Sequence, residues 1–85
     1  MHYVYLLESL LDFSWYIGYS SDLRKRFLSH RNGENKATKH KRPWKLIYYE
    51  TYCNRLDAKK REIFLKSGSG RKFLKRQLTN YLANH

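Results

Sequence analysis

The sequence has little of what cross-links small proteins or places them in membranes. Its single cysteine, Cys53, excludes an internal disulfide framework and leaves no cysteine cluster for a metal, which favours a reducing, cytoplasmic setting. No segment approaches the roughly 20 apolar residues of a membrane span, and the first residues lack the cationic start and long apolar run of an export signal. We therefore predict a cytoplasmic protein that is neither exported nor membrane-spanning.

Acidic residues are also scarce. Seven Asp and Glu stand against eighteen Lys and Arg, which gives a formal net charge of +11. A positive surface of this strength favours nucleic acid as the partner, because binding to phosphates releases counterions. The charge is spread over segments that look folded, and this disfavours the alternatives of an acidic membrane or an acidic protein.

The length fits one small domain, residues 1–85, which we expect to be monomeric. A chain of this size buries only about 60 to 65% of its unfolded surface. Eight Tyr, four Phe and two Trp compensate, because aromatic side chains bury a large area each.

Aromatic and aliphatic runs predict strands at 3–8, 15–19 and 44–52. Ser20, Ser21 or Asp22 can cap a first helix, which Gly33 would end. Residues 34–42 are polar and basic and predict an exposed connection.

Two further helices are expected after the third strand. Asn54 can cap a helix that runs to about residue 67. Gly68 and Gly70 then break the helical pattern, and a last helix is expected near 71–83. The predicted order is strand, strand, helix, strand, helix, helix.

Several separated motifs carry a family resemblance. The segments 3–7 (Tyr-Val-Tyr-Leu-Leu) and 16–18 (Tyr-Ile-Gly), the helical segment 22–26 with His30, and Glu62 together resemble the GIY-YIG nuclease family. The likeness covers nearly the whole chain and is strongest to short stand-alone members similar to the nuclease domain of excinuclease C. It implies an α+β fold in which helices flank a small three-stranded mixed or antiparallel sheet, in the order β-β-α-β-α-α.

The resemblance also implies roles for individual residues. The catalytic positions would be Tyr5, Tyr16, Arg26, His30 and Glu62, and Glu62 would bind one divalent cation, Mg²⁺ or Mn²⁺. Physical chemistry agrees with these roles, since phosphodiester hydrolysis needs an activated water and groups that neutralise the growing charge. Glu62 is also the only acid between residues 58 and 85, where a purely phosphate-binding surface would need none.

Each of these residues has a purely structural alternative. The two tyrosines could fill a small core, and Arg26 could pair with Asp22 one helical turn earlier. His30 could simply place a cation at a helix C-terminus, and Glu62 could pair with Lys59 or Lys66.

Other basic residues are predicted to contact the nucleic-acid backbone, although the loop among them could be merely solvated: Arg24, Lys36, Lys39, Lys41, Arg42, Lys59, Lys66 and Arg71. The segment 67–71 could hold a phosphate or only connect two helices. Trp15 and Trp44 could stack on bases or belong to the core, and Cys53 is expected to fill a core or strand-end position.

Many active family members carry an asparagine roughly a dozen residues after the glutamate, where this chain has Phe73, Leu74 and Lys75, and the next asparagine is Asn80. The leading hypothesis is a metal-dependent endonuclease of low sequence specificity that acts on DNA, possibly in repair or processing. The alternatives are a catalytically weak or inactive nucleic-acid-binding module with the same fold, and an RNA-directed protein.

Overall fold

One antiparallel sheet forms the centre of the molecule, whose computed structural model describes residues 1–85. Its strands are β1 (His2–Ser9), β2 (Trp15–Ser20) and β3 (Trp44–Tyr52), and β1 lies between the other two. The helices are α1 (Leu23–Arg31), α2 (Arg55–Lys66), α3 (Gly68–Gln77) and α4 (Thr79–Ala83), with a short 3₁₀ helix η1 (Lys39–Lys41) before β3. The predicted α+β fold and element order are confirmed, and the sheet is purely antiparallel.

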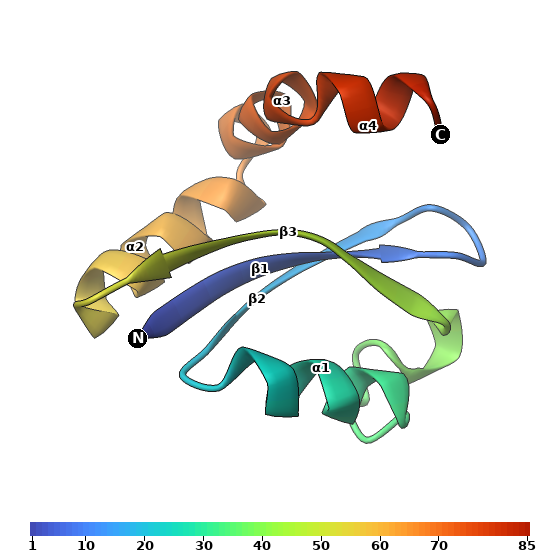
Figure 1. The fold of residues 1–85 in the computed structure, drawn as a ribbon, viewed down its shortest axis with the longest axis horizontal. Helices are drawn as coiled ribbons and strands as arrows, with labels where there is room; N and C mark the ends of the chain where they lie inside the picture. Colours follow the sequence, from blue (N-terminus) through green and yellow to red (C-terminus); the bar gives the residue numbers. More distant parts are fainter.

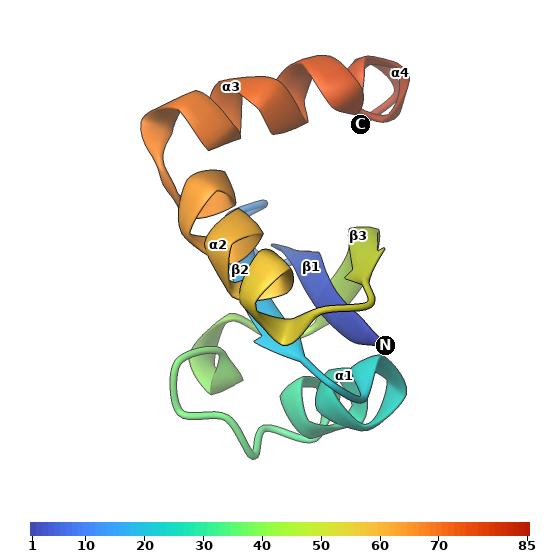
Figure 2. The ribbon, with the colours of Figure 1, turned by 90° about the vertical axis from the view of Figure 1, so that its left-hand side faces the viewer.

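Helices cover both faces of the sheet. Figure 1 shows α1 on one side and α2, α3 and α4 on the other, and Figure 2 shows the same two layers from the side. Successive side chains of a strand point to opposite faces, so the central strand contributes to two separate cores. Val4 and Leu6 pack with residues of α2 and α3, whereas Tyr5 and Leu7 pack with Trp44 on the α1 side.

A bulge in β3 decides which of its side chains reach each core. Leu6 of β1 pairs with Tyr48 and Leu7 pairs with Leu46, so Ile47 is an extra residue without a partner. An extra residue reverses the alternation of side chains along a strand. Leu46 therefore faces the α1 core, while Ile47 and Tyr48 pack against the α2 and α3 core.

Helices α1 and α2 each begin directly after a residue that was predicted as a possible cap. The Asp22 carboxylate accepts a hydrogen bond from the Lys25 amide at 3.0 Å, and the Asn54 side chain accepts one from the Leu56 amide at 2.8 Å. Gly33 follows α1 with a φ of 76°, a left-handed conformation that a glycine adopts without strain.

The C-terminal helices differ from the prediction. Gly68 and Gly70 lie inside the first turn of α3 instead of before it, because Ser67 caps this helix through a 3.1 Å bond from the Gly70 amide. A Cβ at residue 70 would overlap the backbone of Phe64, so the glycine permits close contact with α2. The predicted single last helix is divided at Leu78 into α3 and α4.

Two further expectations about burial hold only in part. The connection 34–42 is largely exposed, but Thr38 within it is fully buried and bonded to α1. Cys53 is exposed just after β3 and fills no core position. The structure contains no helix with the length and apolar character needed to cross a membrane.

Candidate active site

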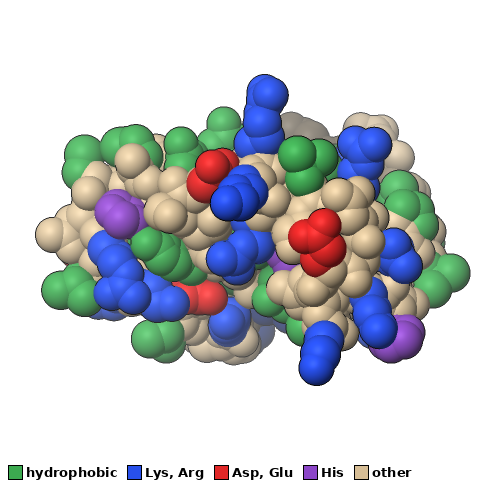
Figure 3. Space-filling view, turned by 90° about the horizontal axis from the view of Figure 1, so that it is seen from below, with side chains coloured by type: hydrophobic (Ala, Val, Ile, Leu, Met, Phe, Trp, Pro, Cys, Tyr) green, Lys and Arg blue, Asp and Glu red, His purple; other side chains and the backbone are tan.

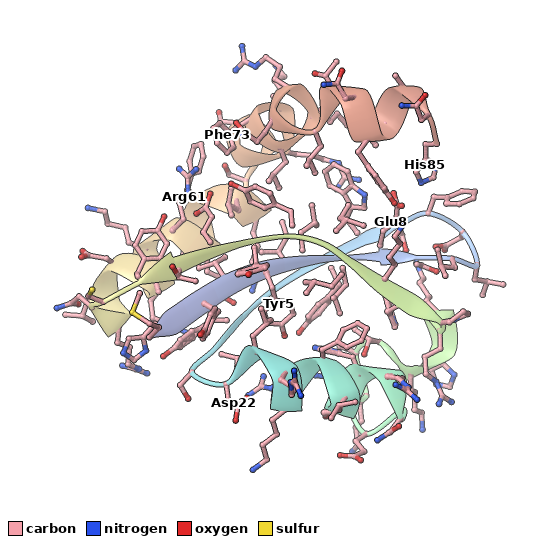
Figure 4. All side chains as sticks on the ribbon, viewed as in Figure 1. Tyr5, Glu8, Asp22, Arg61, Phe73 and His85 are labelled. Atoms are coloured by element: carbon pink, nitrogen blue, oxygen red, sulfur yellow. The ribbon has the colours of Figure 1, made fainter.

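Tyr5 lies at the centre of the candidate site, in the space between the sheet and α1 (Figure 4). Its register partner on β2 is Gly18. A Cβ at residue 18 would overlap the Tyr5 hydroxyl and lie 3.0 Å from the ring carbon Cε1. The glycine therefore provides the space in which the Tyr5 hydroxyl reaches toward the edge of the sheet.

His30 binds the hydroxyl of Tyr5. Its Nε2 atom is 2.8 Å from the Tyr5 oxygen, and its Nδ1 atom is 2.8 Å from Oγ1 of Thr38. Both ring nitrogens thus have partners, although the histidine is completely buried in the last turn of α1. His30 is part of the site and does not serve as an exposed cation at a helix end.

The direction of these bonds follows from the donors and acceptors present. The Thr38 hydroxyl has a second neighbour, the carbonyl oxygen of Asn35 at 3.5 Å, to which it can only donate. This contact favours Thr38 as the acceptor from Nδ1 of His30, an assignment that places the proton of the neutral imidazole on Nδ1. Nε2 is consequently the acceptor, and Tyr5 donates its hydroxyl proton to it.

The protonation states agree with this direction. Burial lowers the pKa of His30, and the nearby Arg26 charge lowers it further, which favours the neutral ring. Burial raises the pKa of Tyr5 well above its usual value, the neighbouring Tyr16 adds to this increase, and Arg26 partly opposes it. At neutral pH the resting site therefore contains a protonated tyrosine hydrogen-bonded to a neutral histidine.

Tyr16 and Arg26 complete the group around Tyr5. The Tyr16 ring lies 6.5 Å from the Tyr5 ring and 5.1 Å from the His30 ring, measured between centroids. Arg26 is exposed on α1 and forms no ion pair with Asp22, which excludes the alternative that these two residues pair. The structure thus brings together four of the five predicted catalytic residues.

Glu62 approaches from the other face of the sheet. It lies on α2, which packs against β1 and β2, and its charge is the smallest of the contributions that raise the pKa of Tyr5, after burial and Tyr16. Its carboxylate oxygens bind Lys59 at 3.2 Å and Lys66 at 3.0 Å, and its side chain is only 12% exposed. Burial opposes ionisation of Glu62, but the bonds from Lys66 and Lys59 outweigh it and lower the pKa. The helix pairing considered as an alternative is therefore present.

A divalent cation at Glu62 would have only one protein carboxylate. No group of three His, Cys, Asp or Glu side chains is placed to enclose a metal. This donor set fits a cation such as Mg²⁺ that keeps several waters and is bound jointly by one carboxylate and the substrate phosphate. It does not fit a cation enclosed by protein ligands alone.

Residues at the position of the asparagine in the family pattern belong to the core on the α2 and α3 side of the sheet. Leu74 is fully buried in the core between the sheet and the C-terminal helices, and Phe73 packs beside it, 6.2 Å from the Phe64 ring. Arg61 lies over Phe73 at 4.6 Å, as the two labelled side chains in Figure 4 indicate. Asn80 is exposed on α4.

The predicted backbone-contacting residues fall on both sides of the sheet. Arg24 lies on α1, and the loop that precedes β3 carries Lys36, Lys39, Lys41 and Arg42. Several of these cations already have partners within the molecule: Lys41 pairs with Asp12 at 3.2 Å, Lys59 and Lys66 pair with Glu62, and Arg71 lies over the Trp15 ring at 5.2 Å.

The remaining alternatives are decided by packing. Trp44 is buried and donates to the Thr38 carbonyl at 2.8 Å, and Trp15 packs against the core of Val4 and Leu6, so both tryptophans are structural. Segment 67–71 forms the cap and first turn of α3, so it is neither a free phosphate cradle nor a plain connector.

Sequence reasoning missed two residues. Thr38 orients His30, yet nothing in the polar loop 34–42 distinguishes it from its neighbours. Glu8 is buried on β1, where it accepts bonds from Trp15 at 3.1 Å, Tyr81 at 2.6 Å and His85 at 2.6 Å (Figure 4). The sequence feature that could have identified Glu8 is its place as an acid at the end of an apolar strand. In the structure, its bonds to Tyr81 and His85 connect the C-terminus to the sheet.

The chain is similar in sequence to known proteins. The GIY-YIG catalytic domain matches residues 1–76. A UPF0213 protein of Staphylococcus saprophyticus is 41% identical over 75 residues, which cover 87% of this chain and 90% of that protein. The UPF0213 protein YazA of Bacillus subtilis is 38% identical over 66 residues, covering 76% of this chain and 66% of that protein.

A solved structure shares the fold as well. The solution NMR structure of a UPF0213 protein from Bacillus halodurans is 36% identical and superposes with a TM-score of 0.55, covering 94% of this chain and 83% of that one. Sequence match and fold therefore agree: the chain belongs to the GIY-YIG family, whose catalytic domain has a nuclease-type fold.

Proposed function

We propose that this protein is a metal-dependent endonuclease that hydrolyses phosphodiester bonds in DNA with low sequence specificity, in DNA repair or processing. The observation that carries the proposal is the hydrogen-bonded series of Tyr5, His30 and Thr38 beside Arg26. A small hydrophobic core can be filled by apolar side chains and does not need a buried tyrosine bonded to a neutral, oriented histidine. It is an arrangement suited to moving a proton.

The proton path follows from the bond directions. A water that attacks phosphorus gives its proton to the Tyr5 oxygen as Tyr5 passes its own proton to Nε2 of His30. His30 becomes a cation with both nitrogens protonated, and Nδ1 continues to donate to Thr38. The histidine supplies the acceptor that Tyr5 needs, because the raised pKa of Tyr5 leaves little phenolate at neutral pH.

Arg26 would bind the charge that grows on the phosphate oxygens, for which its planar guanidinium is suited. A divalent cation held by Glu62, Mg²⁺ or Mn²⁺, would supply further charge neutralisation at the phosphate when bound. Lys59 and Lys66 bind Glu62 in the resting protein, and we expect at least one of them to release the carboxylate when metal and substrate arrive.

The test is a cleavage assay with labelled single-stranded, duplex and branched DNA and with RNA, in Mg²⁺ or Mn²⁺. We expect Tyr5→Phe to reduce cleavage by about 10² to 10⁴-fold, because it removes the proton-transfer group and keeps the ring. Glu62→Gln should reduce cleavage strongly in either metal, because it removes the only protein carboxylate proposed to hold the cation. Undiminished cleavage by Glu62→Gln would contradict the metal assignment, and undiminished cleavage by Tyr5→Phe would contradict the proton path.

A nucleic-acid-binding module without catalysis is the second candidate. Two observations favour it: both oxygens of Glu62 are occupied by lysines, and Tyr5 is only 1% exposed. This candidate predicts no cleavage of any substrate by the wild-type protein, together with binding that weakens steeply as salt rises. Cleavage of RNA but not of DNA would instead support an RNA-directed enzyme.

A further inference from the structure

A second hollow lies on the opposite side of α1 from the catalytic residues. It is an open groove of about 880 Å³ between α1 and β3, and its walls include Tyr3, Phe27, Leu28 and Tyr49. Arg26 and His30 lie toward Tyr5 on the β2 side of α1, whereas Phe27 and Leu28 turn toward this groove. The groove is thus separate from the site described above.

The groove combines exposed aromatic surface with free positive charge. Tyr49 is 52% exposed, and its ring is 6.2 Å from that of Tyr3 at a tilt of 56°. Arg24 and Arg31 line the same groove, seven residues apart on α1, which places them about 10 Å apart along the helix. Neither arginine forms an ion pair, so both charges are available to a ligand. Asp22 is the single acid in the lining.

The view from the α1 side agrees with this description. Figure 3 shows Lys and Arg side chains distributed over this face among exposed hydrophobic ones, with few acids. An anionic ligand that also has flat apolar surfaces matches such a face. Unpaired nucleotides have both properties, because every base has an aromatic face and every linkage has a charged phosphate.

The groove is also connected to the catalytic side of α1. Ser21 and Asp22, at the start of the helix, line both the groove and a polar hollow of about 390 Å³ that contains Arg26. A chain lying in the groove can therefore continue around the start of α1 toward Arg26. The two hollows together describe a path for a strand that extends beyond the reacting phosphate.

The geometry points to the groove between α1 and β3 as a binding site for single-stranded DNA flanking the cleaved phosphate. A base stacks on the exposed Tyr49 ring, and Arg24 and Arg31 bind the neighbouring phosphates. Duplex DNA fits poorly, because its base faces are covered by neighbouring pairs. The apolar wall favours deoxyribose over ribose, whose 2′-hydroxyl would need a polar partner. This inference rests on the proposed function in its choice of DNA.

The test measures binding without cleavage. Fluorescence anisotropy with a fluorescein-labelled oligo-dT in EDTA gives the affinity of the wild-type protein and of its variants. We expect Tyr49→Ser to weaken binding about tenfold, the effect of one lost base-stacking contact, whereas Tyr49→Phe keeps the ring and stays within about twofold. Arg31→Gln should reduce the slope of log affinity against log salt by about 0.7.

Matched controls lie on the other side of the sheet. Leu56 is 70% exposed on α2 and Arg76 is exposed on α3. Leu56→Ser therefore removes an exposed apolar side chain, as Tyr49→Ser does, and Arg76→Gln removes an exposed charge, as Arg31→Gln does, but both lie away from the groove. An oligonucleotide containing 5-iododeoxyuridine should crosslink to the tryptic peptide 46–55, which contains Tyr49.

Several outcomes would overturn the inference. It fails if Tyr49→Ser binds oligo-dT as tightly as the wild type does, or if its loss of affinity is no greater than that of Leu56→Ser. It also fails if duplex DNA or RNA of equal length competes better than single-stranded DNA. Because binding is measured in EDTA, loss of binding in Tyr49→Ser supports the groove even if the protein cleaves nothing, and cleavage with unchanged binding supports the nuclease without the groove.

Discussion

The Tyr5 hydroxyl and Nε2 of His30 lie 2.8 Å apart, and both residues are shielded from solvent between β1 and α1. Burial raises the pKa of Tyr5, so little of its phenolate form is present at neutral pH. By itself the protonated tyrosine is a poor base. The histidine changes this, since it provides a neutral acceptor for the phenolic proton. We therefore propose the pair as the functional unit, and its geometry depends on the residues that surround it.

Thr38→Val tests the orientation of His30. Valine keeps the shape of threonine but cannot accept the proton of Nδ1, so we expect slower cleavage with unchanged DNA binding. Leaving the buried Nδ1 proton without a partner should cost about 1 to 3 kcal/mol of stability. ¹⁵N chemical shifts of the His30 ring would report the tautomer directly. A ring that keeps its proton on Nδ1, with normal cleavage, would contradict the role of Thr38.

Gly18→Ala tests whether the absence of a side chain at residue 18 makes room for the Tyr5 hydroxyl. The added methyl group would overlap the Tyr5 hydroxyl, so the tyrosine must move away from His30 or the strand must shift. We expect reduced cleavage and a loss of about 1 to 3 kcal/mol in the free energy of unfolding, measured by urea denaturation. Gly68→Ala is the matched control, because its Cβ would meet nothing within 4 Å and alanine is the better helix former. Equal effects at the two positions would refute this explanation.

The pH dependence of cleavage should follow His30. Burial and then Arg26 lower the pKa of this histidine, so its neutral form persists below the usual value of 6.5. We expect cleavage to be constant near neutral pH and to fall in the acidic range as His30 gains a proton. Stability should fall in the same direction, because below pH 6.5 the unfolded chain binds a proton that the folded chain resists.

NMR titration of the His30 ring protons would measure this pKa. His30→Gln should remove the acidic limb of the cleavage profile together with most of the activity. A His30 that titrates above pH 6.5 would contradict both the burial and the direction of the hydrogen bond.

Tyr81→Phe tests the attachment of the C-terminal helix. Burial opposes ionisation of Glu8, but hydrogen bonds from Tyr81, Trp15 and His85 lower its pKa below the usual 4.5. Removing the Tyr81 hydroxyl should cost about 1 to 3 kcal/mol at pH 7, measured by thermal unfolding. The contribution of Glu8 is present above its unfolded pKa and is lost as pH falls through the folded value, so the difference from wild type should shrink at low pH.

Tyr3→Phe is the control for this substitution, because the Tyr3 hydroxyl has no hydrogen-bond partner within the molecule while the ring lies in a comparable, partly buried position. A Tyr81→Phe protein as stable as the control at pH 7 would show that the Glu8 cluster adds nothing to stability.

The sequence by itself determined the order of the elements, the cap at Asn54, the segment 20–22 from which the first helix is capped, and the strongly basic character of the surface. Alternating aromatic residues, capping side chains and net charge are local or additive properties, so they can be read without a fold. The separated motifs likewise identified Tyr5, Tyr16, Arg26 and His30, and the structure brings these four together.

Only the tertiary structure decided which groups meet. The extra residue Ile47 assigns the side chains of β3 to their cores, and burial selects Thr38 from a polar loop to orient His30. Folding also gives Glu62 two lysine partners and Glu8 a tyrosine and a histidine from the C-terminus. These contacts join distant residues, and their energies depend on burial and on distances of about 3 Å, which no local pattern of residues contains.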